Sequence, residues 1–282
     1  MSVMIFDKDD QPVEAEFIGF AGGERHVQLD PARIQKIETP RTLTIRAHLA
    51  SSDDVMDLFL LADAIIRIDD AACLRLELPY LPYARQDRVC APGQAFSLNV
   101  FARLLRCLPN VTEIVTWDCH SPEGLAQLGA ASISASDIIL TCPALVDLLA
   151  DDRSVLISPD KGGVPRTRAI AAAVGQPTVL LASKIRDPRT GMISHTEVEP
   201  ADLTGRTAII TDDICDGGFT FTLLAAALRE RGAARVILFV THGIFSRGLN
   251  VFDGLIDEIY TTDSRLPPND PRLHVIPFQH AF

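Results

Sequence analysis

The sequence predicts an α/β fold with mainly parallel β-sheets. Short apolar segments alternate with amphipathic ones along the chain, and this alternation is typical of strands joined by crossover helices. The alternation runs twice, and in each half an apolar strand ends in acidic and small polar residues. A chain of 282 residues is long enough for two domains of about 140 residues each.

The composition indicates an acidic cytoplasmic protein. The net charge of −11 argues against nucleic-acid binding, which requires a basic face. No apolar run reaches the ~18 residues of a membrane span, and the N-terminus has no secretion signal. The six cysteines lack C-x-x-C spacing and are expected to be reduced thiols. We therefore expect neither a nucleic acid nor a membrane as partner.

Apolar runs and their period predict the individual elements. The predicted strands are 13–20, 43–48, 73–78, 111–116, 154–158, 178–182, 207–211, 235–240 and 258–261. The predicted helices are 53–67, 96–107, 143–150, 164–174, 219–231 and 246–250. The small and polar stretch 130–142 is expected to separate the two halves. The polar segment 187–202 is predicted to be a long mobile loop of the kind that closes over active sites.

The segment 207–221 carries the most chemical information. An apolar strand runs into the acid pair Asp212 and Asp213, which suits ribose hydroxyls or a magnesium ion. Glycines then allow close approach of the backbone, and the amides of a helix start favour an anion. The turn and helix start contain Asp216, Gly217, Gly218, Phe219 and Thr220. A sugar phosphate would satisfy all of these groups, whereas the alternative is an ordinary capped helix start.

Polar motifs also follow two strands of the first half. In P-Y-L-P-Y-A-R-Q-D-R, Arg85 can clamp phosphate oxygens and Gln86 can read a base edge, with Asp87 beside them. His120 follows the next strand and could contact a metal or a phosphate. The alternative for the Arg85 motif is a plain surface loop, and the alternative for His120 is a structural role.

Further motifs belong to the second half and to the N-terminal region. Asp160 lies in S-P-D-K-G-G-V, a strand, acid and glycine turn that could hold a metal or simply cap a helix. Lys184 and Arg186 end a strand and could close over a polyphosphate, or be a solvated strand end. Phe20 to Glu24 form a predicted turn between two strands, with a plain hairpin as the alternative.

Taken in order, these segments resemble the ribose-phosphate diphosphokinases, the enzymes that make phosphoribosyl diphosphate (PRPP). The resemblance covers about residues 17–248 of the 282. It includes P-Y-L-P-Y-A-R-Q-D-R, F-S-L-N-V-F-A-R-L-L, T-W-D-C-H-S, S-P-D-K-G-G-V, K-I-R, D-D-I-C-D-G-G-F-T and T-H-G-I-F-S. The chain is expected to be a divergent member that is shortened at its N-terminus.

The resemblance implies two tandem phosphoribosyltransferase type I domains, which are Rossmann-like, with the active site between them. We expect an ATP-side domain at 1–138, a ribose 5-phosphate domain at 139–263, and a tail, 264–282, that packs back on the first domain. The implied substrates are ATP and ribose 5-phosphate, and the implied cofactor is Mg²⁺. A homo-oligomer built from dimers, up to a hexamer, is also implied.

The resemblance assigns roles by motif. Lys184 and Arg186 would be catalytic, and His120 and Asp160 would lie near the metal. ATP would be held by Phe20, Glu24, Arg85, Gln86, Asp87 and His120, with Phe20 and Glu24 facing the adenine of a neighbouring subunit. Ribose 5-phosphate would be held by Asp212, Asp213, Asp216, Gly217, Gly218, Phe219 and Thr220.

The chain departs from the family pattern at several positions. The family has Thr where Gly217 stands, a small residue where Phe219 stands, and Asp or Asn where Gly22 stands. Three alternatives to PRPP synthesis therefore stay open. They are a diphosphokinase with another nucleotide or sugar phosphate, a non-catalytic regulatory homologue, and a phosphoribosyltransferase that consumes PRPP.

Overall fold

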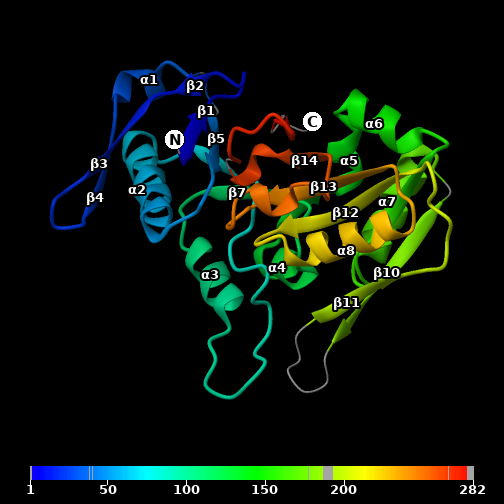
Figure 1. Cartoon of the computed structure of the whole chain (residues 1–282). Coiled ribbons are helices and arrows are strands. Elements are labelled where there is room, and N and C mark those ends of the chain that lie inside the picture. The colour runs from blue at the N-terminus through cyan, green and yellow to red at the C-terminus, as the bar shows by residue number, and fades with distance from the viewer. Residues whose placement is uncertain are drawn as a thin grey trace. The chain divides into compact units, whose positions relative to one another are not determined.

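The chain folds into two compact α/β units, Met1–Ile133 and Ser134–Phe282. The computed structural model describes residues 2–37, 39, 41–176, 178–186, 193–265 and 267–277, with the backbone alone at 184–186 and 193–195. Figure 1 shows the elements of both units. The prediction of an α/β fold with mainly parallel sheets is confirmed, and the division after Ile133 compares with a boundary predicted after residue 138.

The first unit is built on a six-stranded sheet in the order β2-β1-β5-β6-β7-β8. Strands β5 to β8 are parallel, whereas β1 and β2 add to one edge in antiparallel fashion. The strands are β1 (Val3–Phe6), β2 (Pro12–Val13), β5 (Thr42–Ala47), β6 (Cys73–Leu78), β7 (Val111–Trp117) and β8 (Ala131–Ile133). The helices are α1 (Pro31–Gln35), α2 (Ser52–Ile68), α3 (Ser97–Leu105) and α4 (Pro122–Leu128).

Helix α2 illustrates how the sequence sets an element of this unit. Ser51 caps its N-terminus and forms a capping box with Asp54, so two backbone N–H groups of the first turn are satisfied. Leu58, Leu61 and Ile65 recur at helical spacing and are fully buried against the sheet. The two-stranded hairpin β3 (Ala15–Gly19) and β4 (Arg25–Leu29) packs on the same helix.

The second unit contains a seven-stranded sheet in the order β11-β10-β9-β12-β13-β14-β15. All neighbours are parallel except β10 and β11. The strands are β9 (Ser154–Ser158), β10 (Val179–Arg186), β11 (Ile193–Val198), β12 (Thr207–Cys215), β13 (Arg235–Gly243), β14 (Glu258–Thr262) and β15 (Leu273–Ile276). The α-helices are α5 (Ala135–Leu140), α6 (Pro143–Ala150), α7 (Val164–Val174) and α8 (Phe219–Glu230), with short 3₁₀ turns η1 (Asn250–Phe252) and η2 (Asp263–Arg265).

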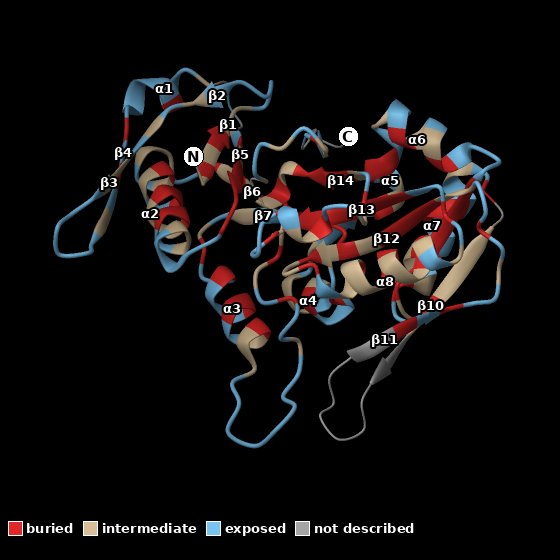
Figure 2. Cartoon of the chain, in the orientation of Figure 1, coloured by how far each residue is buried: buried red, intermediate tan, exposed pale blue. Residues whose placement is uncertain are grey.

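The central strands of this sheet are buried along most of their length because both faces are covered. Every residue of β9 is buried, as is every residue of β13 after Arg235, and Figure 2 shows β13 mostly in red. Helix α7 packs on β9, β10 and β12 beside α5 and α6, while α8 packs on β13 and β11. None of the helices in the described part of the chain has the length and apolar character that a bilayer crossing requires.

Three local predictions are wrong. Residues 264–282 were expected to pack on the first domain, but Leu273–Ile276 pair with β14 and extend the sheet of the second unit. The expected helix at 246–250 is instead a turn that precedes η1. The expected loop at 187–202 contains strand β11, which pairs with β10 in a hairpin, and the part from 187 to 192 lies outside the described residues.

Truncation of a central core residue tests the sheet of the second unit. Leu238 on β13 is fully buried, so Leu238→Ala should lower the free energy of unfolding by about 2–5 kcal/mol. Leu140 on α5 is 50% exposed, and Leu140→Ala should change it by no more than about 0.5 kcal/mol. Urea unfolding followed by circular dichroism measures both, and equal effects would contradict this account of the core.

Candidate functional site

The carboxyl ends of parallel strands bring the predicted residues of the second unit to one edge of its sheet. Strands β10, β9 and β12 are neighbours, and Ser158 at the end of β9 pairs with Leu181 while Ile157 pairs with Ile210. The chain beyond these positions carries Asp160, the continuation of β10 to Arg186, and the acid pair that follows Thr211. Such an edge is where open α/β sheets bind ligands.

The acid pair is held by a cation that sequence analysis did not select. Asp212 and Asp213 lie near the end of β12, with side chains 19% and 8% exposed. Arg166 from the first turn of α7 places one nitrogen 3.7 Å from Asp212 Oδ1 and another 3.3 Å from Asp213 Oδ2. The Asp213 amide also donates to Asp212 Oδ1 at 2.9 Å. Arg166 therefore balances part of the charge of two adjacent carboxylates.

One of the two acids keeps its proton at neutral pH. Burial, with the neighbouring charge of Asp213, raises the pKa of Asp212 from 3.8 to about 8. Arg166 acts in the opposite direction but does not cancel the desolvation. Near pH 7, before any ligand binds, Asp212 can thus donate a hydrogen bond. A divalent cation or a network of hydroxyl groups would favour its ionised form.

The glycine turn is fixed on one side to the turn that follows β13, and on the other side it packs against a phenylalanine. Asp216 accepts a hydrogen bond from Ser246 Oγ at 2.6 Å, and its carbonyl accepts the Ser246 amide at 3.1 Å. Gly218 caps α8 in the left-handed conformation, with φ +79°, and a Cβ atom there would lie 2.7 Å from Phe252 Cζ. Phe219 begins the helix and is 50% exposed. The turn therefore has one fixed shape at the start of α8.

A second acidic turn lies after β9. Asp160 Oδ1 accepts the amides of Gly162 and Gly163 at 3.0 and 3.1 Å, and the Asp160 carbonyl accepts Ser158 Oγ. Helix α7 then starts at Val164 without a side-chain cap. The carboxylate of Asp160 thus orders the turn that precedes the Arg166 helix.

Lys184 and Arg186 belong to β10, and their side chains lie outside the described residues. Their backbone pairs with β11, Lys184 opposite Thr196 and Arg186 opposite Ile193. Strand β10 thereby runs beyond the level at which β9 ends. Their catalytic role stays a prediction.

In the first unit the structure brings two predicted motifs together. The loops after β6 and β7 leave the same edge of the sheet, where Leu78 pairs with Thr116. Asp87 accepts a hydrogen bond from Ser121 Oγ at 3.1 Å, and Ser121 also caps α4. The side chains of Arg85, Gln86 and His120 around this contact are exposed. The hydrogen bond between Ser121 and Asp87 therefore joins the two loops that carry these exposed cationic and amide side chains.

The predicted turn at Phe20–Glu24 is the tip of the β3–β4 hairpin. The Phe20 amide donates to the Glu24 carbonyl at 2.9 Å, and Phe20 is 54% exposed. Just beside this tip, Arg25 ties the hairpin to α2, because its guanidinium donates to both oxygens of Asp57 at 2.8 and 2.5 Å. Figure 1 draws the tip well away from α3 and α4, so these two residues are not part of the loop pair within this chain.

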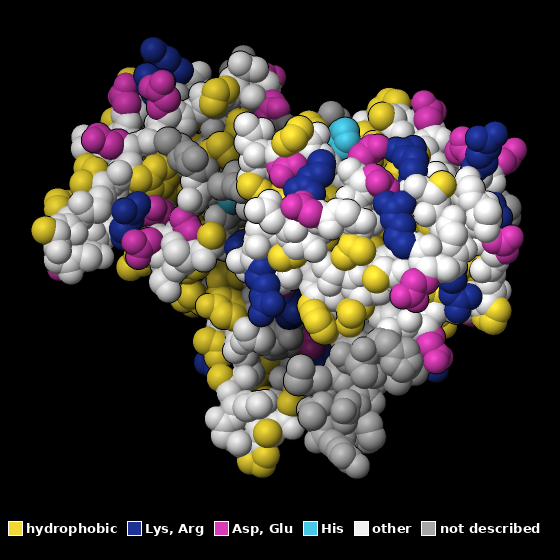
Figure 3. All heavy atoms as spheres, in the orientation of Figure 1, with side chains coloured by type: hydrophobic (Ala, Val, Ile, Leu, Met, Phe, Trp, Pro, Cys, Tyr) yellow, Lys and Arg dark blue, Asp and Glu magenta, His cyan; other side chains and the backbone are white. Residues whose placement is uncertain are grey.

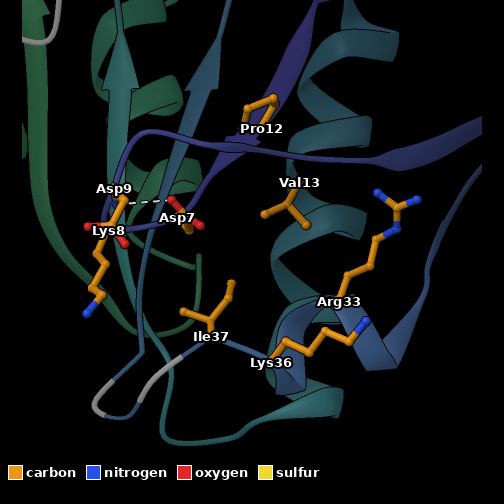
Figure 4. A pocket seen from close by; sticks show the side chains of 8 residues that line it. All are labelled: Asp7, Lys8, Asp9, Pro12, Val13, Arg33, Lys36 and Ile37. Atoms are coloured by element: carbon orange, nitrogen blue, oxygen red, sulfur yellow. Dashed lines mark hydrogen bonds between the residues drawn. The ribbon is translucent and has the colours of Figure 1, made fainter.

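A cavity of about 370 Å³ in the first unit lies apart from all of these residues. Its lining mixes cationic, acidic and apolar side chains from the N-terminal strands and α1, as Figure 4 shows. The lining residues are Asp7, Lys8, Asp9, Pro12, Val13, Arg33, Lys36 and Ile37. None of the predicted site residues is among them. On the face drawn in Figure 3, acidic and basic side chains of the described residues are interspersed.

The metal prediction remains a prediction. In the parts of the chain that the structure describes, no group of three or more His, Cys, Asp and Glu side chains is arranged to hold an ion. Magnesium commonly uses one or two carboxylates with the remaining ligands from substrate phosphates and water. Asp160 and the acid pair supply oxygen donors of this kind, whereas the nitrogen of His120 suits magnesium less well.

Two residues that contact the predicted site were missed, although both lie in motifs that sequence analysis selected. Arg166 is part of S-P-D-K-G-G-V-P-R-T-R, and Ser246 ends T-H-G-I-F-S. Arg166 could have been found from its place two residues after Val164, in the first turn of the predicted helix at the same sheet edge as the acids. Nothing in the local sequence indicates that Ser246 contacts Asp216, thirty residues away.

Comparison with known proteins gives one consistent result. The profile of the phosphoribosyl transferase domain matches residues 144–251. A ribose-phosphate pyrophosphokinase of Vibrio parahaemolyticus is 32% identical over 257 residues, which are 89% of this chain and 78% of the relative. One from Thermococcus kodakarensis is 29% identical over 270 residues, 94% and 90% of the two chains. The crystal structure of phosphoribosylpyrophosphate synthetase from Mycobacterium smegmatis superposes with a TM-score of 0.77 at 25% identity, over 95% of this chain and 87% of that one.

The pKa of Asp212 predicts a pH-dependent stability. Because the folded protein holds a proton between pH ~4 and ~8 that the unfolded chain releases, stability should fall as the pH rises, by up to about 1.4 kcal/mol per pH unit. Asp212→Asn should flatten this slope between pH 5 and 8 in urea unfolding. Asp152→Asn, an exposed acid before the amino end of β9, should leave it unchanged. Equal slopes in the wild type and Asp212→Asn would refute the assignment.

The close approach at Gly218 predicts a steric penalty. Gly218→Ala combines a positive φ with a Cβ contact to Phe252, whereas Gly254→Ala, at φ +72°, has no atom within 4 Å of the added Cβ. The Gly254 variant should lose about 1 kcal/mol of stability for conformation alone. The Gly218 variant should lose about 1–3 kcal/mol more for overpacking. Thermal unfolding measures the stability of both variants. Equal losses would show that the turn accommodates a methyl group at Gly218 without a steric penalty.

Proposed function

The chain belongs to the ribose-phosphate pyrophosphokinase family, also called ribose-phosphate diphosphokinases, and we propose that it is a PRPP synthetase. It would transfer the β,γ-diphosphoryl group of ATP to the 1-hydroxyl of ribose 5-phosphate and release AMP. The observation that carries the proposal is the edge of the second sheet, where an acid pair stands before a glycine turn and a helix start. This edge provides both the acceptors for a sugar and the amides for a phosphate.

The second unit would position the acceptor. Asp212 and Asp213 would bind the ribose hydroxyls, because carboxylates accept hydrogen bonds from vicinal diols and Arg166 keeps them in place. The turn from Asp216 to Thr220 would bind the 5-phosphate through backbone N–H groups at the start of α8. The free 1-hydroxyl would then be held in one orientation, which is the main requirement for an in-line reaction.

The first unit would position ATP. Arg85, Gln86 and His120 are exposed around the Asp87–Ser121 contact, and they offer cations and an amide to phosphates and a base. The exposed Phe20 at the hairpin tip, with Glu24, would contact the adenine of a neighbouring subunit. The active enzyme would accordingly be a homo-oligomer assembled from dimers, up to a hexamer.

The transfer itself needs positioning and charge neutralisation. The 1-oxygen forms a bond to the β-phosphorus, the bond from that phosphorus to the oxygen bridging the α- and β-phosphates breaks, and AMP leaves with that oxygen. The hydroxyl proton passes to solvent. Lys184 and Arg186 would stabilise the charge that develops on the transferring group. Bound Mg²⁺ would neutralise phosphate charge, and the Asp160 carboxylate would supply one oxygen donor to it. All six cysteines are free, in keeping with a reducing compartment such as the cytoplasm.

Substitution of Lys184 tests the proposal directly. Purified protein with ATP, ribose 5-phosphate and magnesium should form AMP and PRPP in equal amounts. Lys184→Ala should lower kcat about 10²–10³-fold, the effect of losing one charge-stabilising donor. Lys36→Ala removes a lysine from the first unit and should retain activity.

The alternatives give different results in the same assay. A diphosphokinase with another substrate would form no AMP with ribose 5-phosphate but would do so with a different nucleotide or pentose phosphate. A regulatory homologue would be inactive with every pair and would change the activity of a separate synthetase. No AMP from ATP and ribose 5-phosphate would overturn the proposal.

A further inference from the structure

Arg247, which lies outside the motifs named above, packs against the turn at residues 216–220, called the phosphate turn below. A Cβ atom built on Gly217 would lie 3.5 Å from Arg247 Cδ, 3.6 Å from its Nε and 3.7 Å from its Cγ. The stem of Arg247 therefore covers the face of residue 217 that a side chain would otherwise occupy. Gly217 offers no side-chain donor of its own to a phosphate.

The turn that carries Arg247 is attached to the phosphate turn through its backbone. The amides of Ile244 and Phe245 donate to the Cys215 carbonyl at 2.8 and 3.2 Å, and Ser246 bonds to Asp216 through both its amide and its hydroxyl. The Gly248 amide closes the turn on the Phe245 carbonyl at 2.8 Å. These hydrogen bonds hold Arg247 beside Gly217, although the Arg247 side chain is exposed to solvent.

The acidic side chains around the phosphate turn create a need for a positive charge such as that of Arg247. Three acidic side chains, Asp212, Asp213 and Asp216, lie on or beside the turn at residues 216–220. Arg166 is already paired with Asp212 and Asp213. A phosphate dianion would be repelled here without a further positive charge.

Arg247 has the properties required to supply that charge. It forms no salt bridge with any described residue, so its guanidinium is not committed to an acid. A guanidinium presents several N–H donors in one plane and commonly binds phosphate through two of them. The dianion would bind between Arg247 and the amides at the start of α8.

We propose that Arg247 is a substrate-binding residue that recognises the 5-phosphate of ribose 5-phosphate and compensates for the missing side chain at Gly217. This inference rests on the proposed function for the identity of the sugar phosphate. It names a specificity determinant that distinguishes a phosphorylated pentose from free ribose. The effect of removing it falls on the affinity for the sugar phosphate and not on the affinity for ATP.

Calorimetric titration with ribose 5-phosphate tests the proposal without turnover. Arg247→Ala should weaken binding about tenfold, because a charge-assisted contact to phosphate contributes about 1.5 kcal/mol or more. Arg247→Lys should recover part of the loss. Arg153→Ala is the matched control, because it removes an exposed arginine before the amino end of β9 and should bind within about twofold of the wild type.

A compensating variant separates phosphate recognition from a general disturbance of the turn. Gly217→Thr in the Arg247→Ala background places a hydroxyl donor where the arginine stem lay, and it should recover part of the affinity for ribose 5-phosphate. In steady-state assays Arg247→Ala should raise KM for ribose 5-phosphate about tenfold and leave KM for ATP unchanged.

The outcomes distinguish this inference from the proposed function. Wild-type affinity for ribose 5-phosphate in Arg247→Ala would overturn the inference even if the enzyme makes PRPP. Equal loss of affinity for ATP would also overturn it. Binding of ribose 5-phosphate that depends on Arg247, in a protein that forms no AMP, would support the inference and refute the synthetase. Absence of ribose 5-phosphate binding in the wild type would refute both.

Discussion

The parallel hydrogen bonding of β12 to β9 and β13 is the constraint on which the site in the second unit depends. Parallel register requires that every strand ends at the same edge, so acids and turns distant in sequence meet there. Gly243 at the end of β13 shows how tight this edge is, since a Cβ there would lie 2.8 Å from Thr261 Oγ1 on the neighbouring strand. Such close contacts restrict the loops at this edge to one arrangement.

That arrangement concentrates negative charge in a partly buried place. Asp212 responds by holding its proton, Asp213 by pairing with Arg166, and Asp216 by accepting a hydroxyl from Ser246. Three neighbouring acids are costly to hold together in a partly buried place, and ligand hydroxyls, a divalent ion or an arginine would relieve that cost on binding.

The elements that sequence analysis predicted well are those whose pattern is local. Strands β6 and β9 and helices α6 and α7 begin and end where apolar runs, prolines and glycines place them. The failures arise from contacts distant in sequence. A helix was expected at 246–250, yet the amides of residues 244–246 bond to Cys215 and Asp216, and the chain that follows forms a turn. Likewise β15 is short and half-exposed, and only its pairing with β14 makes it a strand.

The residues of the candidate site likewise divide into those that local sequence predicts and those that only the fold brings together. The acid pair and the glycine turn were visible because their residues are adjacent in sequence, whereas Arg166 and Arg247 act through space. Behind the edge, His242 Nδ1 lies 2.8 Å from Ser264 Oγ, and Thr262 Oγ1 donates to the Thr241 carbonyl at 2.6 Å. These buried polar groups join the ends of β13 and β14 and support the turn that carries Ser246 and Arg247. The loops that would touch substrate can differ from those of relatives because the strands beneath them are fixed.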